Sequence, residues 1–484
     1  MAPGQIKMLI GSIRRKPTTA PDRKTDQDAA ATAKVDKTGV IHDIVHGSLK
    51  EKKFMAQALT TLAAGEPMND KDLLLENGVS MLQSLPPTSG LSSKISDGFI
   101  QMLYNDLPHP SATVAGPTSK YRRHDGGGNN LWNPEMGAAW TPYARNVPPK
   151  KPKGPNLPDP ELVYEQLLKR DDKKFREHPS GLNRLFFSFA TIVIHECFQT
   201  NRENQWINET SSYVDLSTLY GNTGEEQKRV RTYNNGTIYP DAIASERIML
   251  MPPGVVALLV IFSRNHNTIV KNLLSVNEEG KYKPWDSLDK EKQEWQDNDL
   301  FQVARNINVG FFATVVLKDY VAAILNTPRA DSTWWLDLGK EIKSGAQRIE
   351  RGAGSLVSCE FAVLYHWHAA LSAADATWME ELIRWHNPDL KSMDEVTPQS
   401  FYKVVMAEGA KLKKTPPQLW EFDKYKRGPD GRFNDVELAE LIKDCIEEPA
   451  HAFGAHGTPS SLKVVDVLGQ LQARNVFNVC TMNE

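Results

Sequence analysis

The sequence predicts an all-α protein, and three of its features lead to this prediction. Apolar residues recur at helical spacing over long stretches of the chain. The alternation of apolar and polar residues that marks a half-buried strand is almost absent, and there is no internal repeat. With 484 residues, of which 40% are hydrophobic, the chain is long enough to bury a large core. We therefore expect many helices packed around one extended core.

The expected elements follow in a simple order along the chain. Residues 1–45 are polar and charged, and we expect a mobile arm there. Residues 46–107 predict a helical segment interrupted by glycine and proline, and the many Gly, Pro and Asn residues of 108–160 predict loops lying over a scaffold. We treat 108–484 as one large domain, whose helices are expected at 160–175, 181–200, 253–277, 288–326, 333–350, 355–372, 376–386, 398–412 and 435–447.

Composition narrows the function classes. A net charge of −3 and the lack of a long basic stripe argue against nucleic acid as a partner. The four cysteines make neither a CxxC pair nor a disulfide framework, and the N-terminus lacks the apolar region of a signal peptide. The most apolar runs, at 185–194, 255–262 and 309–317, are short of the roughly 20 residues that span a bilayer. We expect an intracellular protein that is cytoplasmic or peripheral to a membrane, and a homo-oligomer is compatible with the sequence.

The stretch FAVLYHWHAAL, at 361–371, places a tyrosine and two histidines in an apolar segment. Ser355 is a candidate N-cap for a helix over 355–372. On such a helix Phe361, Tyr365 and His368 share one face, so a phenol and an imidazole meet the same space about one turn apart. A histidine on an apolar helix face is a usual ligand of haem iron. Satisfied core residues are the alternative, which the pairing of Tyr365 with His368 disfavours.

A second histidine lies in similar surroundings. His195 belongs to the stretch LFFSFATIVIHECFQT, which is apolar on nearly all helix faces, and Glu196 follows it directly. A neutral imidazole buried there, on the open side of a haem, could move the proton of a hydroperoxide while its O–O bond breaks. Taken alone, a core histidine bonded to a backbone carbonyl is the commoner interpretation. The partner histidine at 368 gives the catalytic interpretation its weight.

The stretch NETSSYVDLSTLYGNTGEEQ, at 208–227, predicts either a cation site or a capped turn. Its oxygen-bearing residues alternate along the chain, so hydroxyl, carbonyl and carboxylate oxygens could converge on one ion. Calcium takes six to eight such oxygens. A turn in which Asp215 caps the following helix is an equally good interpretation. The candidate ligands are Ser211, Tyr213, Asp215 and Ser217.

These three stretches resemble, in order and in style, motifs of the animal-type haem peroxidase superfamily. LYHWH at 364–368 is similar to the cyclooxygenase signature, and IHECF at 194–198 to the distal-histidine motif. SSYVDLSTLYG at 211–221 resembles the calcium loop, above all that of the fungal fatty-acid (linoleate) dioxygenases and psi-factor-producing oxygenases. The resemblance covers roughly residues 95–484. It implies the helical fold of the cyclooxygenases and myeloperoxidase.

The resemblance also implies a role for each residue. His368 would be the proximal ligand of the iron of haem b, and His195 the distal histidine. Tyr365 would carry a radical after the haem has reacted with a hydroperoxide. That radical would abstract a hydrogen atom from a C18 polyunsaturated fatty acid such as linoleate, and O2 would add to give a hydroperoxide. The implied partners are therefore an unsaturated fatty acid and O2.

Calcium is implied in the same way, by the loop residues Asp215, Ser211, Tyr213 and Ser217. Two positions depart from the family pattern. Glu196 stands where many members have an aspartate that contributes to the calcium site, which puts that ion in question. Thr191 stands where cyclooxygenases have a glutamine, which puts ordinary peroxidase activity in question.

The resemblance leaves several alternatives open. Fungal members often continue into a P450-like domain, but no FxxGxxxC motif surrounds Cys445 or Cys480, so that domain is absent from this sequence. Either the protein is a stand-alone dioxygenase or the sequence was cut, and if nothing follows we expect the hydroperoxide to be the product. One rival is a conventional haem peroxidase of small phenols or halides. Another is an α-dioxygenase, which oxygenates the carbon next to the carboxylate. A third, from a different class, is a haem-binding or scaffold protein without catalysis.

Overall fold

The computed structural model describes residues 60, 79, 82, 85, 86 and 89–105; 121–130 and 133–146; 157–171 and 174–327; 336, 337, 343, 344, 347 and 348; and 356–479. The expected arm at 1–45 lies outside the described residues. So do most of the segment at 46–107 and most of 333–350.

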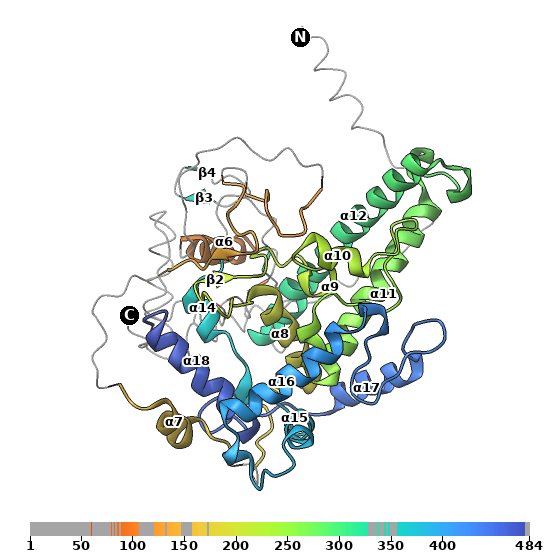
Figure 1. The fold of residues 1–484 in the computed structure, drawn as a ribbon. Coiled ribbons are helices and arrows are strands. Elements are labelled where there is room, and N and C mark those ends of the chain that lie inside the picture. Colours follow the sequence, from red (N-terminus) through yellow and green to blue (C-terminus); the bar gives the residue numbers. More distant parts are fainter. Residues whose placement is uncertain are drawn as a thin grey trace.

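Three long helices form the central packed group, and two of them reach out to the upper right edge of the molecule (Figure 1). They are α8 (Arg184–Cys197), α11 (Pro253–Val276) and α12 (Lys290–Thr314). Helix α11 packs against both α8 and α12, and α17 (Asp435–Glu447) packs against α8 and α11. Near its start α11 buries Val255, Val256, Leu259 and Val260, because it is apolar on nearly every face there. A helix of this kind belongs in the interior, and it supports α8 from behind.

Local signals in the sequence determine where the central helices begin. Asn183 caps α8 by accepting a hydrogen bond from Phe186 N at 3.0 Å, and Asp289 caps α12 through Lys292 N at 2.9 Å. Helix α11 starts with Pro253 in its first turn, where a missing N–H is tolerated. It ends at Asn277, whose φ of 40° is left-handed. The cap at Asn183 places His195 in the last turn of α8.

The other helices surround this centre. They are α6 (Gly90–Asn105), α7 (Pro160–Val163), the π-helical η2 (Tyr164–Leu168), α9 (Ser217–Tyr220), α10 (Gly224–Val230), the π-helical η6 (Val315–Tyr320), α13 (Val321–Ile324), α14 (Cys359–Leu364), α15 (Ala373–His386), α16 (Pro398–Lys413) and α18 (Lys463–Asn475). Short 3-10 turns are η3 (Glu246–Leu250), η4 (Glu278–Gly280), η5 (Trp285–Ser287), η8 (His368–Ala370), η9 (Met393–Glu395), η10 (Pro417–Leu419) and η11 (Ser460–Leu462).

Strands are minor in the part of the chain that the structure describes. β1 (Thr141–Pro142) pairs antiparallel with β2 (Ile207–Asn208), and β3 (Lys343–Ser344) pairs antiparallel with β4 (Gln347–Arg348). The all-α prediction is confirmed. The helix expected at 333–350 is wrong at residues 343, 344, 347 and 348, which form the two short paired strands. Gly345 falls between them, and a glycine inside a helical pattern lowers its helix propensity.

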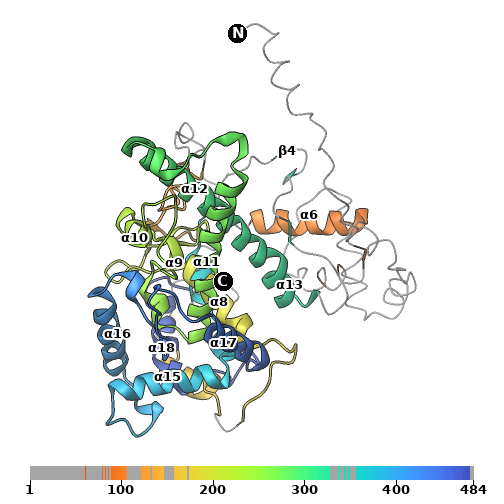
Figure 2. The ribbon, with the colours of Figure 1, turned by 90° about the vertical axis from the view of Figure 1, so that its right-hand side faces the viewer.

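The C-terminal helices form one end of the molecule. In both ribbon views α15, α16 and α18 lie below α8 and α12 (Figure 2). Helix α15 packs on α16, and α18 packs on both α14 and α7. Residues more than 100 positions apart therefore meet where α18 passes α14.

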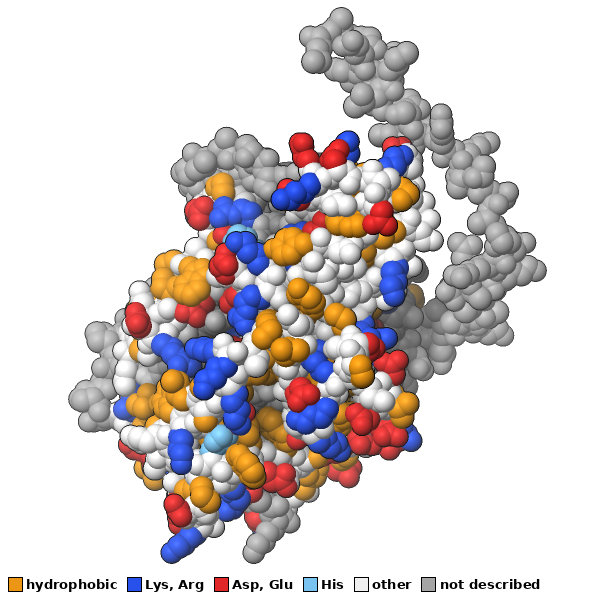
Figure 3. Space-filling view, turned by 45° about the vertical axis from the view of Figure 1, so that its right-hand side comes forward, with side chains coloured by type: hydrophobic (Ala, Val, Ile, Leu, Met, Phe, Trp, Pro, Cys, Tyr) orange, Lys and Arg blue, Asp and Glu red, His pale blue; other side chains and the backbone are white. Residues whose placement is uncertain are grey.

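The surface carries charges of both signs. On the face drawn in Figure 3, basic and acidic side chains are interspersed with apolar ones, in keeping with the small net charge. Among the described residues one helical stretch, Lys290–Ile324, is long and apolar enough to cross a membrane by length and composition. Core helices of soluble proteins share that property, so it does not by itself place the chain in a bilayer.

Candidate functional site

The FAVLYHWHAAL stretch is not one continuous helix. Helix α14 starts at an N-cap formed by Ser358, not Ser355, whose Oγ accepts from Phe361 N at 3.1 Å. The helix ends at Leu364, because Tyr365 turns to φ −83° and ψ 76°. His366 then donates from Nε2 to Ala362 O at 2.9 Å, which satisfies a carbonyl at the open helix end. The expectation that Tyr365 and His368 share one helical face is wrong.

The break separates the environments of Tyr365 and His368. After it, His368 begins the 3-10 turn η8. The Nδ1–H of His368 donates to Asp466 Oδ1 of α18 at 2.5 Å. A carboxylate can only accept here, so the bond fixes the proton on Nδ1 and leaves Nε2 as the free nitrogen. That is the arrangement of a histidine prepared to bind a metal through Nε2.

His195 has a matching arrangement on α8. Its Nδ1–H donates to Thr191 O, one turn earlier, at 2.8 Å, which again leaves Nε2 as an acceptor. Burial lowers the pKa of His195 to about 3, and the neighbouring Arg247 acts in the same direction. The imidazole is therefore neutral at ordinary pH and able to accept a proton.

Arg247 holds the end of α8 in place. Its guanidinium donates to His195 O at 2.6 Å and to Phe198 O at 2.7 Å, so it binds carbonyls that the helix leaves open. Burial lowers the pKa of Arg247 to about 10, which still leaves it charged. Burial and, after it, the positive charge of Arg247 keep His195 neutral, and the backbone bonds of Arg247 hold the helix end that carries it.

His195 and His368 line the same cavity, which we call the histidine cavity. Its volume is about 900 Å³, within the usual range for sites of small molecules and cofactors. His366, Trp367 and Arg247 also line it. The structure therefore brings together two histidines that the sequence predicts as a pair and that come from α8 and η8.

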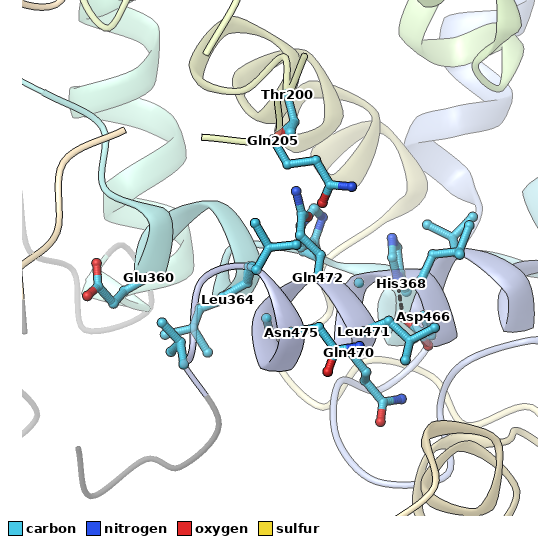
Figure 4. Close-up of a pocket in the computed structure, with 18 of the residues that line it drawn as sticks. Thr200, Gln205, Glu360, Leu364, His368, Asp466, Gln470, Leu471, Gln472 and Asn475 are labelled. Carbon is cyan, nitrogen blue, oxygen red and sulfur yellow. Dashed lines mark hydrogen bonds and ion pairs between the residues drawn. The ribbon is translucent and has the colours of Figure 1, made fainter. Parts of the chain in front are cut away.

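A second cavity, the α18 cavity, adjoins the first. Its volume is about 1040 Å³, and it shares His366, His368 and Arg202 with the histidine cavity. Figure 4 shows α18 along this cavity, with Asp466 bonded to His368 and with Leu471 and Leu364 on the walls. Many of the remaining lining residues are apolar, including Val363, Val465, Leu468 and Val476.

Tyr365 lies outside the lining of both cavities. Its hydroxyl is hydrogen-bonded to that of Tyr320 in η6. Burial raises the pKa of both phenols, and that of Tyr320 rises further through the neighbouring Tyr365. The Tyr365 ring lies edge-on to Trp367, with 5.7 Å between ring centroids. Because Trp367 lines the histidine cavity, its indole connects that cavity to the phenol.

The predicted calcium ligands are close together but are engaged in other bonds. Asp215 is fully buried, and the Arg122 guanidinium forms an ion pair with its Oδ1. Ser211 Oγ donates to the other oxygen, Oδ2, at 2.5 Å. The hydroxyl of Tyr213 donates to Met136 O at 2.8 Å. Both oxygens of the central carboxylate therefore already have a donor.

Glu196, which stands where many family members have a calcium-site aspartate, is also engaged in other bonds. Its oxygens accept from Ser217 N at 2.7 Å and Thr218 N at 2.9 Å, and from the Thr218 hydroxyl. These are the first amides of α9, so Glu196 caps a helix start. Burial raises the pKa of Glu196 to about 7. Its donors suit an anion, and they leave it poorly placed to bind an ion at Asp215.

The loop is closely packed against the residues around it. Gly126, with a φ of 76°, lies so close that a Cβ there would collide with Ser211 Oγ and Asp215 Oδ2. Arg305 of α12 donates to Arg122 O at 3.1 Å and to Arg123 O at 3.2 Å, which fixes the backbone that carries Arg122. Only Ser217 Oγ, buried without a hydrogen-bond partner, resembles an open ligand in the described loop. The residues do not fit a calcium ion, since a guanidinium stands against the carboxylate that would bind it.

The histidine cavity, in contrast, fits a haem. Two imidazoles offer Nε2 atoms that their Nδ1 bonds leave open, and one of them has the carboxylate partner typical of a metal-bound histidine. The cationic side chains Arg202, Arg229 and Lys413 on its walls supply positive charge for the carboxylates of a porphyrin. His368 would bind the iron, whereas His195 would not bind it.

Four residues of this site were not predicted from the sequence. Asp466 lies 98 positions after His368, on a helix that was not expected. Its stretch KVVDVLGQL has helical spacing, which could have predicted α18 but not the contact. Tyr320, Arg247 and Arg122 carry no local signal, because their roles arise only from packing between distant segments.

Comparison with known proteins agrees with this geometry. The family model described as animal haem peroxidase matches residues 121–206 and 243–380, which contain His195, Tyr365 and His368. Psi-producing oxygenase A of Emericella nidulans is 38% identical over 481 residues, covering 99% of this chain and 43% of that protein.

Two further relatives are similar to the same extent. The 7,8-linoleate diol synthase of Pyricularia oryzae is 37% identical, over 94% of this chain and 38% of that protein. The linoleate 10R-lipoxygenase of Aspergillus fumigatus is 36% identical, over 92% of this chain and 40% of that protein. The chain thus spans less than half the length of these curated relatives. The family model matches the segments that carry both histidines of the cavity, and the first relative matches 99% of the chain. The chain therefore belongs to the animal haem peroxidase family.

Proposed function

We propose that this protein is a haem-dependent fatty-acid dioxygenase that converts a C18 polyunsaturated acid such as linoleate to a hydroperoxide. One observation carries the proposal. His195 and His368 line one cavity with their Nδ1 atoms already bonded, and Tyr365 lies just before His368 beside an indole of that cavity. The names of the relatives, which act on linoleate or produce psi factors, support the same chemistry.

The two histidines would have different roles in the reaction. His368 would hold the iron through Nε2, with its ring oriented by Asp466. When bound, the haem supplies an oxidant that draws an electron from a nearby aromatic residue after reaction with a hydroperoxide. His195, neutral and with a free Nε2, takes the proton from the hydroperoxide and returns it to the departing oxygen.

Tyr365 would perform the step on the fatty acid. Having lost an electron and its phenolic proton, the tyrosyl radical takes a hydrogen atom from a bis-allylic carbon and becomes a phenol again. O2 adds to the carbon radical, and the resulting peroxyl radical takes a hydrogen atom from Tyr365 to leave a hydroperoxide. Trp367 provides an aromatic contact between the histidine cavity and the phenol. Tyr320 orients the Tyr365 hydroxyl.

The volume and the lining of the α18 cavity suit a long apolar ligand. Its volume of about 1040 Å³ and its Val and Leu lining suit an acyl chain, and it meets the histidine cavity at His366 and His368. Arg202 lines both cavities, so it is placed to attract a carboxylate of either the substrate or the cofactor. We also propose an intracellular location with peripheral membrane contact, as expected for an enzyme whose substrate partitions into lipid.

Calcium, which the resemblance implies, is not part of this proposal. Arg122 and Ser211 already bond both carboxylate oxygens of Asp215, and Glu196 accepts hydrogen bonds from the first amides of α9. We propose instead that the loop is held by the internal ion pair, without a metal ion.

The proposal is tested with Tyr365→Phe. This variant should bind haem as the wild type does, with the same Soret spectrum, but should consume no O2 with linoleate. Tyr233→Phe is the matched control, because Tyr233 is half exposed and lies outside both cavities. Undiminished oxygen uptake by Tyr365→Phe would rule out the tyrosyl mechanism.

Substrate tests separate the rivals. Turnover of guaiacol without linoleate-dependent oxygen uptake would indicate a conventional peroxidase. Oxygenation of palmitate at the carbon next to the carboxylate would indicate an α-dioxygenase. Haem binding without either activity would indicate a protein that has lost catalysis.

A further inference from the structure

We propose that the exposed face of helix α16 docks on a bilayer with negatively charged headgroups, and so brings the opening of the α18 cavity to the lipid that contains the fatty acid. We call this face the α16 surface. Its residues are Gln399, Tyr402, Lys403, Met406, Ala410, Lys413 and Lys414. The inference rests on the proposed function for its purpose, since an acyl substrate gives the docking a use. It goes beyond that function by naming the face and the charge of its partner.

The periodicity of α16 explains why these residues lie together. They recur at spacings of three and four positions, which places them along one side of a helix. On the opposite side Val404 and Leu412 are buried, and α16 packs against α15 and η3. Figure 2 shows α16 at the outer edge of the end that the C-terminal helices form. The α16 surface is therefore turned away from the core.

The α16 surface is positively charged, in contrast to the chain as a whole. It contains three lysines and no acidic residue, whereas the net charge of the chain is −3. Glu408, the acidic residue of α16, lies on the other side of the helix. There it accepts hydrogen bonds from His386 Nε2 and from Lys411 Nζ, each at 2.6 Å. Its charge therefore does not neutralise the lysines of the surface.

Two of the three lysines are available to a partner. Lys413 lies 3.7 Å from Glu246, but Lys403 and Lys414 form no ion pair within the part of the chain that the structure describes. Lysine stems lie along apolar surface while their ammonium groups reach the headgroups. Each lysine close to an anionic leaflet contributes to the attraction. The charge of the surface therefore matches an anionic bilayer.

Apolar side chains lie between these lysines. Met406 is 59% exposed and Tyr402 is 47% exposed. Single exposed apolar residues are common on soluble proteins, but here two of them share one stripe with the lysines. An apolar stripe flanked by lysines is the pattern of helices that lie in the plane of a membrane interface.

The α16 surface adjoins the cavity proposed for the substrate. Tyr402 lines the α18 cavity, and Phe401 lines both cavities. Because Tyr402 is exposed and also forms part of the wall, it lies where the cavity opens to the outside. A bilayer against the α16 surface would face this opening, so that a fatty acid passes from lipid to cavity without crossing bulk water.

A second apolar face is the competing explanation. Ile307 and Phe311 of α12 are about half exposed, and they lie in the stretch that is long and apolar enough to cross a membrane. If that face docked, binding would depend on its apolar side chains and little on the charge of the lipid. Lipid composition therefore separates the two faces.

The experiment is sedimentation of the haem-loaded chain with vesicles of phosphatidylcholine alone or of equal parts phosphatidylcholine and phosphatidylserine. The wild type should bind the mixed vesicles about tenfold more tightly or better, and Lys403→Glu/Lys414→Glu should lose about that factor, because each lysine attracts the anionic surface. Lys271→Glu/Lys290→Glu makes the same charge change at exposed lysines of α11 and α12. This control should bind as the wild type does.

The apolar contact has its own pair of variants. Met406→Ser should weaken binding to the mixed vesicles by about threefold or more, because it removes apolar surface that enters the lipid. Ile307→Ser is the control and should bind as the wild type does. Lys403, Lys414 and Met406 line neither cavity, so their variants should consume O2 at the wild-type rate with linoleate supplied without vesicles.

Three outcomes would overturn the inference. They are a wild type that binds neither kind of vesicle, a Lys403→Glu/Lys414→Glu variant that binds the mixed vesicles as tightly as the wild type, and an Ile307→Ser variant that loses more affinity than Met406→Ser. A wild type that binds no vesicles but dimerises through these lysines in analytical ultracentrifugation would assign the surface to a second copy. If vesicle binding is as expected but the chain consumes no O2 with linoleate, the proposed function fails and the docking surface stands.

Discussion

At the scale of single residues, His195 is the group whose protonation state matters most. Replacing it with alanine should slow the reaction with a hydroperoxide by about 10²–10⁴-fold, the usual contribution of a general acid–base group. Haem content should not change, because His368 is the proposed ligand of the iron. Stopped-flow recording of the Soret band measures the rate. His456→Asn, which replaces an exposed histidine outside both cavities, should react at the wild-type rate.

The low pKa of His195 predicts an unusual pH profile. Burial lowers this pKa from 6.5 to about 3, so the imidazole is already a free base throughout the range from pH 5 to 8. The rate with hydroperoxide should show no inflection near pH 6.5 from this group. It should fall only as the pH drops toward 3, because protonation then blocks Nε2. An inflection near 6.5 that disappears in His195→Ala would contradict this assignment.

The phenol pair predicts a graded effect. Tyr320→Phe removes the hydrogen-bond partner of Tyr365 but keeps the ring that stacks on Phe186, with 4.9 Å between centroids. A single hydrogen bond contributes about 0.5–1.5 kcal/mol, so oxygen uptake with linoleate should fall by roughly 2- to 10-fold and not vanish. Complete loss with normal haem would mean that Tyr320 itself takes part in the radical chemistry.

At the scale of elements, the sequence predicted regular helices better than interrupted ones. The expected ranges 253–277 and 398–412 agree with α11 and α16, because proline starts and long apolar periodicity coincide there. The range 355–372 contains no Gly or Pro between 356 and 371, so nothing in it indicated the break at Tyr365. That break depends on a side-chain bond of His366 to its own helix end.

The calcium-like loop gives an element-scale prediction about metal removal. Adding EDTA should leave the melting temperature of the wild type unchanged, because Arg122 supplies the positive charge at Asp215. Arg122→Ala should melt at a lower temperature than the wild type. Breaking a fully buried ion pair costs about 3–5 kcal/mol of folding free energy. Because the Arg122 side chain is partly exposed, the loss here should be smaller.

Calcium addition provides the control for that loop. In Arg122→Ala it should recover part of the lost stability by binding the Asp215 oxygen that Arg122 leaves and the Ser217 hydroxyl. Differential scanning fluorimetry measures both effects. A wild type that melts lower in EDTA and recovers with calcium would show that the loop holds the ion after all.

At the scale of the whole molecule, the motifs indicated the family, whereas packing determined the site. The pairing of His195 with His368 was predicted from the resemblance, and one cavity does contain both. The contacts of Asp466 and Arg122 could not be predicted, because each joins segments about 90 to 100 positions apart without a local pattern. Residue types at short spacing are visible in a sequence, but distances between remote segments are not.

The most direct measurement of the central claim is oxygen uptake by this 484-residue chain loaded with haem, followed by analysis of the linoleate products. We expect a Soret band of histidine-ligated haem, consumption of O2 with linoleate, and a hydroperoxide formed mainly at one carbon of linoleate. The Tyr365→Phe variant should consume no O2 and form no hydroperoxide. A haem-loaded chain that consumes no O2 with linoleate, or that gives the same products without Tyr365, would contradict the central claim.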